Sequence, residues 1–308
     1  MDRIAFLHSD RWIVMERALS DKKLIALFLV PGLTIFLVFY FVPILMTAYY
    51  SFQEWDGINP MAFVGLDNYT KMFTADKSFW KAVWNSVAFL LTGVFVQLPL
   101  SFGLALLVSR KMKGRKWFRN IYFFPVVMST TMVSLLWVKI YDPNIGMLNT
   151  LLEAAHLGSW AQAWLGDTKT ALLSVLIVTT WHYVGYNMLI LFAGIQGISE
   201  QYYEAAKLDG AVGWKAVRYI TLPLLSDVLR ICVVLNVIYA LKTFESVYVM
   251  TNGGPLHSTT MIALKMFQEA FLKQNFGYGS ALAVFMVLEC LIIAWVLNKV
   301  LTREKIEY

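Results

Sequence analysis

The sequence has 308 residues, of which 58% are hydrophobic and 15% are charged, with a net charge of +6. Soluble domains of this length carry about 25% charged residues, and apolar runs close to the ~20 residues that cross a bilayer recur along this chain. The composition therefore excludes an ordinary soluble protein and indicates an integral membrane protein. The positive charge follows the distribution of Lys and Arg among the loops, so it does not indicate nucleic-acid binding.

Six apolar stretches predict an all-α membrane protein with six transmembrane helices. Glycine and proline inside them, such as Pro43, Pro99 and Gly194, are better tolerated in membrane helices than in soluble ones. The first stretch is too long and begins too late for a cleaved signal peptide, so we expect it to remain as a span. The six predicted spans are 24–52, 83–109, 121–141, 172–196, 224–250 and 280–301.

The Lys and Arg residues predict the orientation of these spans. Seventeen of them lie in the N-terminal tail, the loop after the second span, the loop at 197–223 and the C-terminal tail, whereas six lie in the three other loops. Because cytoplasmic loops carry the excess of Lys and Arg, we expect both termini in the cytoplasm. The expected organisation is a tail at 1–23, a first helix at 24–52, a core of five helices at 80–301 and a tail at 302–308.

No motif for covalent chemistry or a resident cofactor is present. No glycine is followed directly by lysine, which excludes a P-loop for nucleotide phosphates. The four histidines lack the spacing of a metal site, and Cys232 and Cys290 lie in apolar runs as small packing residues. We expect no catalytic residue and no metal in this chain. Energy for any transport must then come from another subunit or from an ion gradient.

The fourth and fifth predicted spans contain polar side chains, which are costly in lipid and usually face a bundle interior or a cavity. Aromatic rings with amide and hydroxyl groups suit a sugar, because they offer stacking surfaces and hydrogen bonds. The alternative is that these groups only tie helices together. The candidate residues are Thr179, His182, Tyr183, Tyr186 and Asn187 in the fourth span, and Asn236, Tyr239 and Thr243, on one helical face of the fifth.

A polar passage, EAAKLDGAVGWKAVRYITLPLL, interrupts the apolar chain between these two spans. Ser199 is expected to cap a short helix that runs to Asp209, where Gly210 is a natural left-handed stop. Gly213 begins a second short helix, and Pro223 fits the entrance of the next span.

The first of these short helices is unusual for a solvated loop. Ala205 and Ala206 give it a small face that lets another surface approach closely. A helix of about 10 residues is ~15 Å long, which fits a groove on another protein. The alternative is a helix that lies on lipid headgroups, because Tyr202, Tyr203 and Leu208 also suit an interface.

Lys242 and Glu245 lie three residues apart toward the outer end of the fifth predicted span. The simpler interpretation is a mutual ion pair on the helix surface. The alternative is that Lys242 receives an anionic substrate.

Glu204, Ala205, Ala206, Gly210 and the later Ile-x-Leu-Pro follow the pattern E-A-A-x3-G-x9-I-x-L-P. This pattern resembles the EAA loop of binding-protein-dependent ABC importer permeases of the type I class. The resemblance implies that this passage is a cytoplasmic coupling helix docked in a cleft of an ATPase. The residues implied in that contact are Tyr203, Glu204, Ala205, Ala206, Leu208, Asp209 and Gly210.

Further segments are similar to the sugar permease branch, the relatives of the maltose and glycerol-3-phosphate permeases. They are FVGLDNYTKMF, GRKWFRNIYFFPVVMS, IYDPNIGMLN and TNGGPLHST, in family order. The large extracytoplasmic insertion of the maltose permease is absent. The resemblance implies import of a sugar or oligosaccharide by alternating access, with the polar residues of the fourth and fifth spans lining its path.

The implied partners are a second, similar permease, an ATPase dimer that binds ATP and Mg²⁺, and an extracytoplasmic solute-binding protein. The expected location is the bacterial inner membrane. The alternative is a secondary transporter driven by an ion gradient, but the acids in or near the spans are few, with Glu245 and Glu289 the obvious ones, and no inverted repeat is evident. A membrane enzyme would need a catalytic cluster that the sequence does not show.

Overall fold

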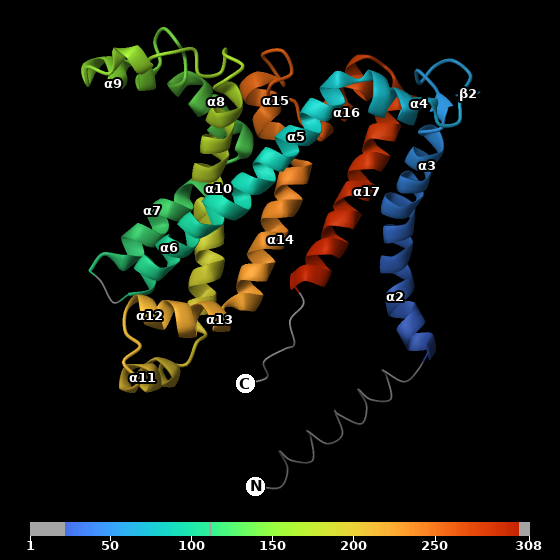
Figure 1. Ribbon diagram of the computed structural model, residues 1–308. Helices are drawn as coiled ribbons and strands as arrows, with labels where there is room; N and C mark the ends of the chain where they lie inside the picture. The colour runs from blue at the N-terminus through green and yellow to red at the C-terminus, as the bar shows by residue number, and fades with distance from the viewer. Residues whose placement is uncertain (1–21, 111–112, 302–308) are drawn as a thin grey trace.

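The computed structural model describes residues 22–110 and 113–301, so most of the predicted tails lies outside the described residues. Long helices run between two ends of the molecule (Figure 1). Within the described part, four helices are long and apolar enough to cross a membrane, and up to six spans result if each of two bent helix pairs is one span. The four are Lys22–Tyr50, Lys77–Ser109, Ala171–Gln196 and Phe276–Leu297.

Three helical segments contain a wide π-helical turn that ends two residues before a proline. A proline donates no backbone hydrogen bond and its ring clashes with the carbonyl one turn earlier, and a wider turn relieves that clash. The first segment consists of α2 (Lys22–Phe36), η1 (Leu37–Phe41) and α3 (Val42–Tyr50), with Pro43. The second consists of α5 (Lys77–Thr92), η3 (Gly93–Gln97) and α6 (Leu98–Ser109), with Pro99. The third consists of α12 (Trp214–Ala216), η5 (Val217–Thr221) and α13 (Leu222–Leu224), with Pro223.

The third predicted span is not one straight helix. It forms α7 (Arg115–Val127) and α8 (Thr130–Ile140), which meet at 97°. The backbone at Met128 and Ser129 is extended, and the Ser129 hydroxyl accepts a hydrogen bond from the Met132 N–H at 3.2 Å. A serine cap therefore starts a new helix inside a stretch whose apolar character predicted a continuous one.

The fifth predicted span is also divided. The segment Trp214–Leu224 meets α14 (Ser226–Lys242) at 72°. Extended backbone at Thr243 then ends α14, and α15 (Glu245–Thr251) is a separate helix. The expectation of one helix over 224–250 was wrong, because apolar composition does not report the backbone turn at Thr243.

The loops predicted outside the cell gather at one end, and the polar passage lies at the other (Figure 1). The strands β1 (Gln53–Glu54) and β2 (Ala62–Phe63) form a small antiparallel hairpin in a protein that is otherwise helical where the structure describes it, as the sequence predicts. The other outer elements are α4 (Asp67–Thr70), η2 (Lys71–Ala75), α9 (Met147–Ala154), η4 (Gly158–Trp160), α16 (Ile262–Phe267) and η6 (Gln268–Leu272). The inner end carries α11 (Glu200–Leu208) and the last turns of α10 (Ala171–Gln196) and α17 (Phe276–Leu301).

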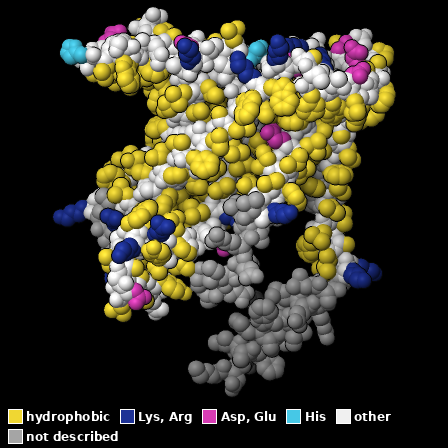
Figure 2. All heavy atoms as spheres, in the orientation of Figure 1, with side chains coloured by type: hydrophobic (Ala, Val, Ile, Leu, Met, Phe, Trp, Pro, Cys, Tyr) yellow, Lys and Arg dark blue, Asp and Glu magenta, His cyan; other side chains and the backbone are white. Residues whose placement is uncertain are grey.

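Helix α10 is the central helix of the bundle, and glycine permits its closest contact. A Cβ added to Gly185 would lie 1.9 Å from the backbone oxygen of Tyr122 in α7, so only glycine allows the two backbones to approach. On α6, the Ser101 hydroxyl donates to the carbonyl of Val184 at 2.8 Å. Hydrophobic side chains cover the middle of the visible face, and most charged side chains lie toward its two ends (Figure 2).

A buried charged cluster ties the outer ends of α5, α16 and α17 together. Lys265 contacts Asp76 at 2.6 Å, and the Tyr278 hydroxyl donates to the same carboxylate at 2.6 Å. Burial raises the pKa of Asp76, but hydrogen bonds from Lys265, Tyr278 and Ser78 outweigh it and hold this pKa well below its usual range. Glu269 accepts from Lys273 at 2.8 Å and lies 3.7 Å from Lys265.

Candidate functional site

A hollow with polar residues in its wall lies between α10 and α14 in the middle of the bundle. Its volume is about 220 Å³. Five of the eight polar residues singled out from the sequence line it, together with Gln97 from η3, Val126 from α7 and Leu235 from α14. The five are Tyr183, Tyr186, Asn187, Asn236 and Tyr239.

Three amide side chains in the wall of this hollow are joined to one another. The Asn236 carbonyl oxygen accepts from Asn187 at 2.9 Å and from Gln97 at 3.3 Å. The Asn236 amide nitrogen in turn donates to the carbonyl of Gly93 at 3.3 Å. Since all three amides are buried, this network fixes α14 against η3 and α10 at the level of the hollow.

The tyrosines supply the aromatic part of the wall. The rings of Tyr183 and Tyr239 lie 4.6 Å apart between centroids, and the Tyr183 hydroxyl is 3.1 Å from that of Thr130 at the start of α8. Tyr186 is 42% exposed, which leaves much of its ring uncovered. The hollow therefore offers ring faces and amide groups side by side.

Three of the predicted residues do not line the hollow. The hydroxyl of Thr179 donates to backbone carbonyls of its own helix, and that of Thr243 donates to the Tyr239 carbonyl at 2.8 Å. The imidazole of His182 lies 3.3 Å from the carbonyl of Met128, at the break between α7 and α8. Of these three, only His182 links two elements, whereas Thr179 and Thr243 bond to the backbone of their own helices. In particular, the predicted helical face ends before Thr243, because α14 ends at Lys242.

Gln97 is the polar residue of the wall that our sequence analysis missed. It lies inside the second predicted span, immediately before Leu98 and Pro99. A polar side chain within a span usually faces a cavity or the bundle interior. This rule identified the candidates in the fourth and fifth spans, and it would also have identified Gln97 in the second.

The wall of the hollow contains a hydrogen-bond acceptor without a partner. The carbonyl oxygen of Asn187 is buried and has no partner among the described residues. A buried acceptor without a partner is costly, so it favours a donor from a water or from a ligand hydroxyl. At about 220 Å³ the hollow is smaller than the roughly 300–1,000 Å³ of typical ligand pockets. One chain therefore supplies a wall or a part of a site for anything larger than one sugar ring.

Lys242 and Glu245 do not form the expected helix-surface pair. The chain leaves the helix between them, at Thr243 and Phe244, so the spacing of three residues no longer puts them on one face. Glu245 instead accepts a hydrogen bond from the hydroxyl of Thr131 on α8. Lys242 is exposed, and no ion pair involves it within the described ranges.

At the inner end, the polar passage forms the predicted short helix, α11, which runs from Glu200 to Leu208. Gly210 has φ of +73° and Gly213 has φ of +61°, so both adopt backbone conformations that favour glycine. Ser199 occupies the N-cap position as predicted, but its side chain makes no capping hydrogen bond. The turn after α11 therefore depends on the conformations of Gly210 and Gly213, whereas the start of α11 does not depend on a hydrogen bond from Ser199.

Most of α11 is uncovered. Leu208 is 91% exposed, whereas Ala206 is 5% exposed and faces the rest of the protein. The hydroxyl of Tyr203 lies 3.1 Å from that of Thr221 in η5 and holds the helix to the chain that follows it. The other predicted contact residues, Glu204, Ala205, Asp209 and Gly210, are all exposed. An exposed leucine beside small and acidic residues presents a surface that another protein can cover.

A family model described as "Binding-protein-dependent transport system inner membrane component" matches residues 97–305. The matched region contains every residue that lines the hollow, from Gln97 to Tyr239, and all of α11.

Individual relatives match nearly the whole chain. The diacetylchitobiose uptake system permease protein NgcF of Streptomyces coelicolor is 37% identical over 87% of this chain and 79% of its own length. The trehalose/maltose transport system permease protein MalF of Thermococcus litoralis is 34% identical over 89% of this chain and 92% of its own.

The fold is also similar to that of a solved transporter. A chain in the structure of a bacterial alginate ABC transporter, in complex with an alginate pentasaccharide-bound periplasmic protein, superposes with a TM-score of 0.79. It is 21% identical, and the match covers 94% of this chain and 96% of that one. This likeness shows that the two chains share a fold.

Proposed function

The chain belongs to the family of binding-protein-dependent transport system inner membrane components, and we propose that it is the permease subunit of an ABC importer for a sugar or oligosaccharide. As a permease it is a transport subunit and not an enzyme. The family assignment gives no support to a secondary transporter driven by an ion gradient.

The wall of the hollow supports a carbohydrate as the cargo. Tyr186 and Tyr239 present ring faces, and Asn187 has an unpartnered carbonyl oxygen. A sugar carries C–H faces that stack on aromatic rings and hydroxyls that donate to such an oxygen. The names of the relatives agree with this chemistry, because they refer to diacetylchitobiose, trehalose and maltose. The juxtaposition of rings and amides in one hollow is the observation that carries this part of the proposal.

The complete importer needs further subunits. A second, similar permease would supply the opposite wall of the path, since the hollow in this chain is small. Two ATPase subunits would bind ATP and Mg²⁺, and an extracytoplasmic solute-binding protein would deliver the sugar. The solved alginate ABC transporter is in complex with an alginate pentasaccharide-bound periplasmic protein, which supports the solute-binding protein as a partner.

The topology belongs to the same proposal. With each bent pair counted as one span, the six spans put both ends of the chain on one side of the membrane. The Lys and Arg distribution supports the cytoplasm as that side, with α11 in the cytoplasm, the hairpin and α9 outside, and a bacterial inner membrane as the location. In that orientation α11 acts as the coupling helix. Its exposed face would follow the closing ATPase dimer, and Tyr203 and Thr221 would pass the motion to η5 and α14.

Reconstitution of the complete importer tests the proposal. We expect uptake to require ATP and the solute-binding protein, and the purified chain to bring the ATPase subunits with it. Uptake driven by a proton or sodium gradient without ATP would overturn it. Topology is tested separately with a reporter that is active only in the cytoplasm. Fusions after Trp214 should be active, and fusions after Gly158 or Gly254 should be silent.

The charge of the sugar can be tested through Lys242. This side chain is exposed and close to the level of the hollow, one residue before the chain leaves α14. Lys242→Ala should leave uptake of a neutral oligosaccharide nearly unchanged and should reduce uptake of a uronate or sugar phosphate strongly. Lys169→Ala, at the start of α10, is the control for loss of an exposed positive charge.

A further inference from the structure

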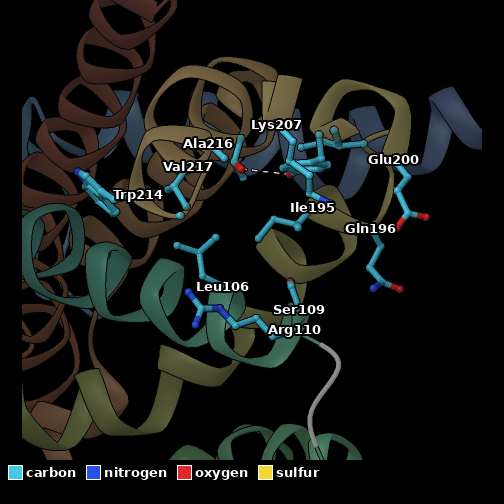
Figure 3. A pocket seen from close by; sticks show the side chains of 14 residues that line it. Leu106, Ser109, Arg110, Ile195, Gln196, Glu200, Lys207, Trp214, Ala216 and Val217 are labelled. Carbon is cyan, nitrogen blue, oxygen red and sulfur yellow. Dashed lines mark hydrogen bonds between the residues drawn. The ribbon is translucent and has the colours of Figure 1, made fainter. Parts of the chain in front are cut away.

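A second hollow lies at the inner end of the molecule, beside α11 and apart from the hollow between α10 and α14. Its volume is about 710 Å³, and its lining comes from the last turns of α6 and α10, from α11 and from the segment α12–η5. Leu106, Ile195 and Val217 point toward one another across it (Figure 3). Because α6 and α10 end here, the hollow lies at the level where the membrane-spanning helices leave the bilayer.

Two positive side chains stand at the rim of this hollow. Arg110 follows the last residue of α6, and Lys207 lies in the last turn of α11 (Figure 3). Both are exposed, and neither has an ion pair or a side-chain hydrogen bond in the part of the chain that the structure describes. Glu200 is the one acid that lines the hollow, so the cations outnumber it.

The apolar part of the lining is suited to hydrocarbon. Leu106, Ile195 and Val217 are half-buried, and Trp214, which also lines the hollow, is 68% exposed. Indole rings favour the boundary between headgroups and acyl chains. An occupant that matches this lining has an anionic head near Arg110 and Lys207 and an apolar body between the helices.

We infer that this hollow binds an anionic phospholipid of the cytoplasmic leaflet, with its phosphate between Arg110 and Lys207 and the start of an acyl chain against Leu106 and Ile195. Basic pockets between membrane helices on the cytoplasmic side recognise such headgroups by charge. The inference rests on the proposed orientation of the chain but not on the identity of the cargo. Since α11 and η5 both line the hollow, a bound lipid would link the proposed coupling helix to the membrane.

A second protein is a poorer match for the same hollow. An ATPase would reach the outward face of α11, where Leu208 is 91% exposed. Leu208 is not part of the lining of the hollow. The hollow lies instead on the side of α11 toward the ends of α6 and α10.

The test measures which lipid stays bound to the complete transporter. The transporter is assembled in nanodiscs of mixed phosphatidylglycerol and phosphatidylcholine, released into mild detergent, and analysed by native mass spectrometry. We expect enrichment of phosphatidylglycerol in the wild type. Arg110→Gln and Lys207→Gln should each lower that enrichment about fivefold, because one Lys or Arg near an anionic surface contributes about 1 kcal/mol.

Lys215→Gln is the matched control. It removes an exposed positive charge from α12, next to Trp214, but Lys215 does not line the hollow. We expect it to keep the wild-type enrichment. Leu106→Trp should lower retention of phosphatidylglycerol by filling the hollow without a change in charge, with an unchanged melting temperature as the check on folding. Equal losses in all three glutamine variants, or no loss in any, would overturn the inference.

A failure of this inference is distinguishable from a failure of the proposed function. If uptake requires ATP and binding protein but the bound lipid shows no preference for phosphatidylglycerol, the lipid site alone is wrong. If the topology reporters place Trp214 outside the cytoplasm, the orientation on which both statements depend is wrong.

Discussion

The two ends of the protein are held together in different ways. At the outer end, Lys265, Asp76 and Tyr278 join three helices through short contacts between buried side chains. At the inner end, α11 leaves Leu208 91% exposed and meets η5 through the hydroxyls of Tyr203 and Thr221. The buried cluster at the outer end satisfies its charges within the chain, whereas α11 at the inner end leaves apolar and charged side chains exposed. We therefore expect the outer end to contribute mainly to stability and the inner end mainly to contact with a partner.

The largest effect is expected from breaking the outer cluster. Lys265→Met leaves the Asp76 carboxylate buried without its cation, which should lower the free energy of unfolding by about 3–5 kcal/mol. Lys273→Met is the control, because the Lys273 side chain is 64% exposed and an exposed pair contributes no more than about 1 kcal/mol. Denaturant titration of the purified protein in detergent measures both. Similar losses in the two variants would show that the outer cluster is not the tie that we describe.

The inner end should respond in transport rather than in stability. Glu204→Lys reverses a charge on the exposed face of α11, and Gly210→Pro forces a φ near −65° where the chain has +73°. Uptake should fall roughly 5–150-fold, the range of coupling free energies between linked sites, while the melting temperature and membrane insertion stay unchanged. Glu153→Lys on α9 is the matched charge reversal at the outer end. Wild-type uptake in both inner variants would refute the coupling assignment.

A smaller effect is expected between the two ends, in the hollow. Tyr186→Phe removes one hydroxyl from the wall, and loss of one hydrogen bond of about 0.5–1.5 kcal/mol should reduce uptake roughly two- to twelvefold. Tyr186→Ala should reduce it further, because the stacking face is lost as well. Thr243→Val is the control, since its hydroxyl bonds to its own backbone outside the hollow. If all three variants transport normally, the wall of the hollow packs helices and does not touch sugar.

The smallest effect is the pH dependence of the outer cluster. Hydrogen bonds from Lys265, Tyr278 and Ser78 hold the pKa of Asp76 well below its usual value. The contribution of Asp76 to the free energy of unfolding is therefore complete above the pKa of an unfolded aspartate, about 3.9, and is lost only as the pH falls below that value. The difference in unfolding free energy between wild type and Asp76→Asn should therefore stay constant from pH 8 to about pH 5. A difference that shrinks within that window would mean that Asp76 is not held ionised by these partners.

Local features of the chain can be predicted from its sequence, whereas contacts between helices cannot. The pattern at 204–223 predicts both the helix α11 and the left-handed glycine that follows it, because helix stops depend on local backbone geometry. The polar residues of the fourth and fifth spans are also evident from sequence, since a polar group within a span is unusual. Which of them share a hollow is not evident, because that depends on how α10, α14 and η3 cross.

The sequence by itself determined the apolar helices and the short helix of the polar passage with its left-handed glycine, because hydropathy and glycine positions act locally. It also predicts the orientation and the coupling role, which stay predictions. Only the tertiary structure decided that Asn187, Asn236 and Gln97 share one hydrogen-bond network. It also decided that the hydroxyls of Thr179 and Thr243 bond to their own helices. Finally, it placed Lys242 and Glu245 on separate helices, because α14 ends between them. The physical reason is that a hydrogen bond between spans depends on the crossing of two helices, and neither helix encodes that crossing alone.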